Sequence, residues 1–263
     1  MSKERLKAPL VEVIFEIRWG ERTQLPNGDT QVKFSNEEQT FLAGELKANL
    51  KPKFPEYEPL HTEMPVDMGI PHFLKHRFWA KKGAWPCVQL GLGLMTVNHA
   101  NDADDYNWAQ FADNCKFALE CLSEAFSVGL EGLQHIGVDL RYRDGFVLRE
   151  NESDSDFIKD RALIDFGMPD AFLNSDLISG TPESHNITFN LPTNKPKGIL
   201  INKLGRAEIS GRPGFLQETV VRSAGPLCPE FNLDSLIEWL DSAHILQQHT
   251  FDTLIKATNE RGA

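Results

Sequence analysis

Positively charged residues gather in two acid-free stretches of the 263-residue sequence. No Asp or Glu lies between Asp67 and Asp102, and none lies between Glu183 and Glu208. The candidate binding residues in these stretches are Lys75, His76, Arg77, Lys81, Lys82, Lys203 and Arg206. Grouped Lys and Arg side chains attract anions such as phosphates or acidic protein surfaces. Strands contain few acidic residues in any case, and lysines protect edge strands from pairing with other chains. We therefore favour a structural origin of the two acid-free stretches over an anion-binding site.

A second polar group lies inside the apolar stripe of a predicted helix at 232–255. His244 and Gln247 fall among Leu and Ile residues at helical spacing, which predicts a buried polar pair. A buried imidazole needs a hydrogen-bond partner, which favours a structural histidine over a catalytic base. The enzymatic alternative is activity on a phosphate-containing substrate, with His76, Arg77 and His244 as participants.

Other residue patterns indicate no specific chemistry. Cys115 and Cys121 are six apart on a predicted helix, a spacing that suits neither a metal site nor a disulfide. His72 and His76 share a strand face without the geometry of metal ligands. The glycines at 91–93 lack the third glycine of a phosphate-binding loop. We therefore expect no cofactor and no metal ion.

Two pairs of segments repeat at nearly the same offset and indicate an internal duplication. The predicted helices at 107–126 and 232–255 share their apolar pattern at an offset of 125 residues. The sequences EIRW at 16–19 and DLRY at 139–142 share the order acid, aliphatic, arginine, aromatic. Both halves also repeat the same order of predicted elements.

The predicted fold is therefore α+β, with a tandem duplication of a strand, helix, antiparallel sheet and long helix. The units are 1–131 and 132–263, packed as one globular body. Joined edge strands could form one continuous saddle-like sheet with helices on one face. This element order is similar to that of the TATA-binding-protein superfamily, an analogy that carries no function.

Local patterns predict the individual elements. Alternating apolar residues predict strands, and a capping-box signature at Ser35 and Glu38 predicts a helix after it. The predicted strands are 9–19, 72–82, 86–99, 136–148, 185–191, 198–204 and 215–223. A helical segment is expected at 154–166, and the Ser-, Asp-, Gly- and Pro-rich residues 169–184 are predicted to form a loop.

Four sequence segments resemble an uncharacterised, sporadically distributed family of bacterial, archaeal and phage proteins. They are PLVEVIFEIRW, VNHANDADDYNWAQF, LRYRD and AHILQQHTFDTLI. The resemblance covers nearly the whole chain. That family's LRY strand usually continues into Asn, whereas Asp144 follows Arg143 here. The resemblance implies a shared fold and a prokaryotic or phage source, and it transfers no catalytic residue because no activity is established for the family.

Composition favours a cytoplasmic globular protein. The net charge is −11, hydrophobic residues make up 41% of the chain, and we expect neither a signal peptide nor a membrane segment. The predicted function is that of a non-enzymatic binding or assembly module. Such a module would be an accessory subunit of a prokaryotic or phage system, for example a defence-associated one. Its expected partner is another protein. Nucleic acid or nucleotide binding through the basic strands is the alternative, and the sequence leaves the oligomeric state open.

Overall fold

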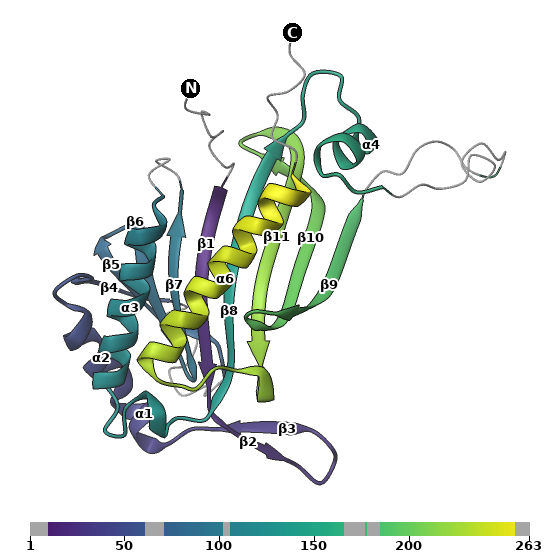
Figure 1. Cartoon of the computed structure of the whole chain (residues 1–263). Helices are drawn as coiled ribbons and strands as arrows, with labels where there is room; N and C mark the ends of the chain where they lie inside the picture. Colours follow the sequence, from purple (N-terminus) through teal and green to yellow (C-terminus); the bar gives the residue numbers. More distant parts are fainter. Residues whose placement is uncertain (1–9, 61–70, 102–105, 166–176, 178–184, 256–263) are drawn as a thin grey trace.

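Nine strands form one antiparallel sheet, and the long helices pack on one of its faces (Figure 1). The computed structural model describes residues 10–60, 71–101, 106–165, 177 and 185–255. Apart from residue 177, the predicted loop at 169–184 lies outside the described residues. The α+β class and a single large antiparallel sheet are therefore confirmed.

The sheet has the strand order β4-β5-β6-β7-β1-β8-β11-β10-β9. Its strands are β1 (Leu10–Trp19), β4 (Glu56–Pro59), β5 (Leu74–Lys81), β6 (Ala84–Gly91), β7 (Leu94–Ala100), β8 (His135–Val147), β9 (Asn186–Asn194), β10 (Lys197–Ile209) and β11 (Arg212–Ala224). A separate hairpin joins β2 (Glu21–Gln24) to β3 (Thr30–Lys33).

Alternation along β1 determines which side of the sheet is covered. Val13, Phe15 and Ile17 are fully buried, whereas Glu16 and Arg18 point to the opposite face. The central pairing with β8 places apolar residues of both strands under the helices. We call the opposite side of the sheet the helix-free face.

Three helices cover the buried face. They contact β5, β7, β8 and β11 and present apolar stripes to the sheet. The helical segments are α1 (Asn36–Thr40), α2 (Leu42–Leu50), α3 (Trp108–Glu124), α4 (Asp154–Asp156) and α6 (Leu233–Leu254), with short turns η1 (Leu130–Gly132), η2 (Phe157–Arg161) and η3 (Gly225–Leu227). The helices that cover the sheet are α2, α3 and α6.

Polar side chains fix where the helices begin. Ser35 and Glu38 form the predicted capping box at α1. The side chain of Asn107 accepts the backbone N–H of Gln110 at the start of α3, and Asn232 accepts that of Ser235 at the start of α6. These bonds satisfy amide groups that have no partner within the helix.

The structure differs from the sequence-based prediction in several segments. The helical segment predicted at 154–166 ends at Arg161, and β4 was not predicted. The predicted strand 86–99 is two strands, because the chain turns at Gly93, which has φ of 70°. A Cβ atom there would lie 2.6 Å from the carbonyl oxygen of Trp19, so only glycine fits. The hairpin of β2 and β3 was not predicted, because its polar, largely exposed strands lack an apolar face.

We expect Phe15→Ala to lower the free energy of unfolding by about 3–5 kcal/mol, because it leaves a cavity in the core. Ile14→Ala, one residue away on the helix-free face, should cost about 1 kcal/mol or less. Urea unfolding followed by circular dichroism measures both. Equal losses would show that β1 does not bury one face selectively.

Candidate functional site

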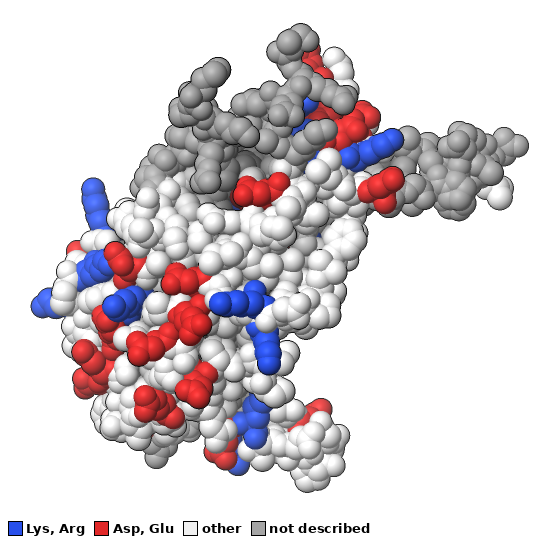
Figure 2. Space-filling view, in the orientation of Figure 1, with Lys and Arg blue, Asp and Glu red and all other residues white. Residues whose placement is uncertain are grey.

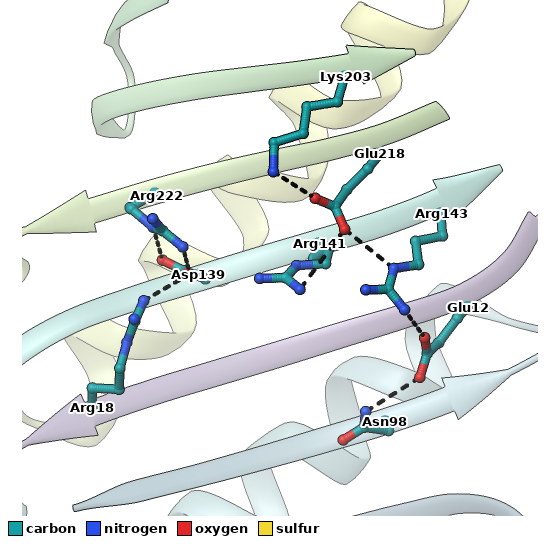
Figure 3. A network of polar contacts seen from close by, with 9 residues as sticks. All are labelled: Glu12, Arg18, Asn98, Asp139, Arg141, Arg143, Lys203, Glu218 and Arg222. Carbon is teal, nitrogen blue, oxygen red and sulfur yellow. Dashed lines mark hydrogen bonds and ion pairs between the residues drawn. The ribbon is translucent and has the colours of Figure 1, made fainter. Parts of the chain in front are cut away.

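A network of ion pairs crosses four neighbouring strands on the helix-free face (Figure 3). We call this network the charged ladder. Its members are Glu12, Glu16, Arg18, Asp139, Arg141, Arg143, Lys203, Glu218 and Arg222. They come from β1, β8, β10 and β11, and their side chains point away from the helices because they alternate with the core residues.

Asp139 is the most deeply buried member of the charged ladder, with 1% of its side chain exposed. Arg222 binds it with both ends of its guanidinium group, at 2.8 Å from Nε to Oδ1 and 2.5 Å from Nη2 to Oδ2. Arg18 reaches the same carboxylate from β1, with 2.8 Å between Nη2 and Oδ2. The hydrogen bonds to Asp139 raise the pKa of Arg222, which keeps this group charged.

Glu218 is the centre of the other half of the charged ladder. Arg143 Nε lies 3.2 Å and Arg141 Nη1 lies 3.8 Å from its Oε2 atom, and Lys203 Nζ lies 3.2 Å from Oε1. Burial alone would raise the pKa of Glu218, but these three cations together lower it. Arg143 also binds Glu12 at 3.1 Å, so the pairs continue from β10 to β1.

The charges of the ladder nearly cancel. Five cations face four carboxylates, and each of its Arg and Lys side chains already has an acidic partner. A phosphate backbone would have to break these pairs to bind here. A protein surface of alternating charge could instead match the pattern without leaving a charge unpaired.

The structure does not bring the seven predicted binding residues together. Arg77 lies on the helix-free face of β5, and Lys203 lies on β10, with five strands between them. His76 faces the helices and its Nδ1 lies 3.0 Å from Tyr57 Oη. Arg206 also points to the helix side, where it pairs with Asp154. Lys75 lies near the start of β5 and is half-buried. Lys81 ends β5 and Lys82 follows it, and both are exposed at the turn into β6.

His244 and Gln247 are both buried beneath α6. Tyr142 Oη lies 2.9 Å from His244 Nδ1, and Tyr106 Oη lies 2.8 Å from Tyr142 Oη. The imidazole stacks on Trp108 with ring centres 3.7 Å apart. Burial lowers the pKa of His244 to about 4, so it is neutral at pH 7. Its contacts are those of a packed structural histidine, and they come from residues that sequence spacing could not connect to it.

Asp144 is a buried carboxyl group without a cation beside it. It lies opposite Gln217 in the β8–β11 pairing, and neither Asp144 Oδ2 nor Gln217 Oε1 has a hydrogen-bond partner. Burial raises the pKa of Asp144 to about 7. This is the position at which the resembled family usually has Asn.

The described cysteines are free thiols, and burial raises the pKa of each. Cys87, Cys115 and Cys121 are buried. Burial raises the pKa of Cys87 to about 12 and those of Cys121 and Cys228 to about 11. Within the described ranges no group of three or more His, Cys, Asp or Glu side chains could hold a metal ion. No helix there is long and apolar enough to span a bilayer.

A shallow groove of about 390 Å³ separates α3 from α6 on the helix-covered side. Its lining is formed by Lys116, Glu120, Leu233, Asp234, Ile237, Glu238 and Asp241. Asp and Glu side chains gather over the lower parts of these helices (Figure 2). The groove contains no histidine or cysteine.

We expect Asp139→Asn to lower the free energy of unfolding by about 2–3 kcal/mol, because Arg18 and Arg222 lose their shared charge partner. The matched control is Lys203→Met, which removes a pair whose lysine is 53% exposed and should cost less than about 0.5 kcal/mol. Urea unfolding distinguishes the two. Equal, small effects would mean that the Asp139 pairs do not stabilise the sheet.

Asp144→Asn should stabilise the protein at high pH. The folded-state pKa of about 7 exceeds the ordinary value of 3.8, so the folded protein holds a proton that the unfolded chain releases. The contribution of Asp144 to the free energy of unfolding therefore falls by about 4 kcal/mol as the pH rises from about 4 to about 7. It stays low at higher pH. The gain of the variant should accordingly be large at pH 8 and shrink towards pH 4.

Urea unfolding of both proteins across this pH range provides the measurement. Asp241→Asn, which changes an exposed carboxylate on α6, serves as the control and should alter stability little. A gain for Asp144→Asn that is the same at pH 4 and pH 8 would contradict a buried, protonated Asp144.

Comparison with known proteins assigns no family to the chain. No protein-family model, no curated protein and no solved structure matches it. No residue role is therefore carried over from a relative. The candidate surface is defined by the geometry and charge of the described residues.

Proposed function

We propose that the chain is a non-enzymatic binding or assembly module that engages another protein through its helix-free face. The observation that carries the proposal is the charged ladder, which occupies the central strands of a face that α2, α3 and α6 leave uncovered. Its members other than Asp139 are partly exposed, so a partner can reach them. An accessory subunit of a prokaryotic or phage system, such as a defence system, fits this role.

Two units related by duplication, 1–131 and 132–263, would account for the arrangement of the sheet. Strand order supports this, because β1 and β8 lie together at the centre and α3 and α6 follow their own half-sheets. The repeated acids Glu16 and Asp139 are directly opposite each other in the β1–β8 pairing, so a pseudo-twofold axis relating the two units would pass between them. Asn107 and Asn232 cap the two helices with the same hydrogen bond. A saddle-like sheet formed by two such units has one free face.

The nature of the charges favours a protein over a nucleic acid as the partner. Binding of nucleic acid depends on Lys and Arg side chains that replace counterions along phosphates. In the charged ladder those cations already neutralise carboxylates, and Asp139 and Glu218 would repel a phosphate. Alternating charge is suited to selecting one protein surface over others.

The enzymatic alternative gains no support from the described residues. His244 is neutral and enclosed by Tyr142 and Trp108, and His76 and Arg77 point to opposite faces of β5. A general base must reach a reacting group together with a nucleophile or acid. These three residues cannot do so at one site.

The experiment is affinity purification of the full chain from its native source, with mass spectrometry of bound protein and nucleic acid. The test variant Glu12→Gln/Arg143→Met removes the pair between these two residues and the contact of Arg143 with Glu218, while Glu218 keeps Arg141 and Lys203 as partners. A partner that binds this face should be recovered about tenfold less well, since loss of about 1.4 kcal/mol of binding energy gives that factor.

The matched control is Lys116→Met/Glu120→Gln in the groove between α3 and α6, which also removes one positive and one negative charge. It should retain the partner. Equal recovery by both variants, loss only in the control, or stoichiometric nucleic acid in place of protein would each contradict the proposal.

A further inference from the structure

The two edges of the nine-stranded sheet differ in how well they are protected. β4 has four residues, two of which are glutamates. β9 has nine residues, NITFNLPTN, with no charged side chain, and seven of the nine are exposed. Natural sheets protect their edges with short strands and charged residues, because an unpaired backbone edge can accept another strand. β4 is short and charged and therefore has this protection, whereas β9 is long and uncharged and does not.

The sequence of β9 is nearly symmetric about its middle residue. Asn190 is the centre, Phe189 and Leu191 flank it, and Asn186 and Asn194 lie at the ends. Phe189 is 39% exposed and Leu191 is 49% exposed, and both lie on the same side of the sheet because they are two residues apart. An antiparallel strand with the same sequence would therefore place asparagine opposite asparagine at the centre and the ends, and an apolar side chain opposite an apolar side chain at 189 and 191.

We propose that β9 pairs antiparallel with β9 of a second copy of this chain, about a twofold axis through Asn190. In this register Phe189 packs against Leu191 of the partner subunit, and the reverse contact follows by symmetry. Thr188 then lies opposite Pro192 of the partner subunit, and the terminal asparagines lie opposite each other. The pairing joins two nine-stranded sheets into one and covers the exposed Phe and Leu side chains.

Charge favours a second copy as the occupant. Like charges directly opposite each other destabilise an antiparallel pair, and a strand that meets itself faces this problem at every charged position. β9 has no such position. Lys195, the first charged residue beyond the strand, would lie opposite position 185 and not opposite another lysine. Pro192 lacks an amide proton and is tolerated at an edge, where it interrupts the new ladder without preventing pairing.

The proposal does not depend on a partner at the helix-free face, because it uses the edge of the sheet. Sedimentation equilibrium of the purified full chain tests it. The wild type should show twice the 29.7 kDa mass of one chain at about 100 µM. Phe189→Lys/Leu191→Lys should show the single-chain mass, since two lysines of each copy would meet two of the other.

The matched control is Ile245→Lys, which places a charge at a 66% exposed apolar position on α6 and should leave the doubled mass unchanged. Circular dichroism establishes that each variant remains folded. A wild type with the single-chain mass at this concentration, or a doubled mass that persists in the double-lysine variant, would overturn the proposal.

A cross-link provides a second test that needs no disruptive substitution. Directly opposite residues of an antiparallel pair have Cβ atoms about 4.5–5.5 Å apart, close to the separation that a disulfide requires. Asn190→Cys, in a chain whose half-buried Cys228 is replaced by Ser, should form a covalent dimer under mild oxidation. Ile245→Cys in the same background should not. Absence of the Asn190→Cys dimer, or equal cross-linking by both variants, would contradict pairing about Asn190.

Discussion

The pairing of β1 with β8 is the interaction on which the rest of the sheet depends. These two strands lie at its centre, and they join segments more than a hundred residues apart. The same register serves both faces: Phe15 meets Leu140 beneath the helices, while Glu16 meets Asp139 on the helix-free face. Side chains alternate with a period of two, so a slip by one residue would bury charges under the helices and expose apolar residues. The core and the charged ladder are therefore two consequences of one register.

Polar groups on the two faces differ in how they are satisfied. On the helix-free face, carboxylates and guanidinium groups from neighbouring strands bind one another, and the partly exposed side chains remain accessible. Beneath α6, Tyr106, Tyr142 and His244 form a neutral chain of hydrogen bonds, whereas Asp144 has no cationic partner. A neutral interior is consistent with structural roles for these groups. The exposed charge pattern is the part of the molecule that can distinguish one partner from another.

Sequence patterns predicted the elements that have a clear apolar face. Alternation identified β1, and helical periodicity with Asn107 and Asn232 identified α3 and α6. The hairpin of β2 and β3 has no such face and was missed. Clustering of cations along the chain did not predict a surface, because the positions of Lys203 and Arg206 differ by three residues and so fall on opposite sides of β10. Partners such as Glu218 for Arg143 depend on strand order, which local patterns do not contain.

Hydroxyl-radical footprinting tests most directly whether the helix-free face is the binding surface. The chain recovered from its native source with its bound partner is compared with the same chain purified alone. The charged-ladder account predicts reduced labelling of Ile199 and Ile201, which share the face of Lys203 on β10, and unchanged labelling of Ile245 on α6. Reduced labelling of Ile245 with no change at Ile199 and Ile201 would place the partner on the helices and contradict the account.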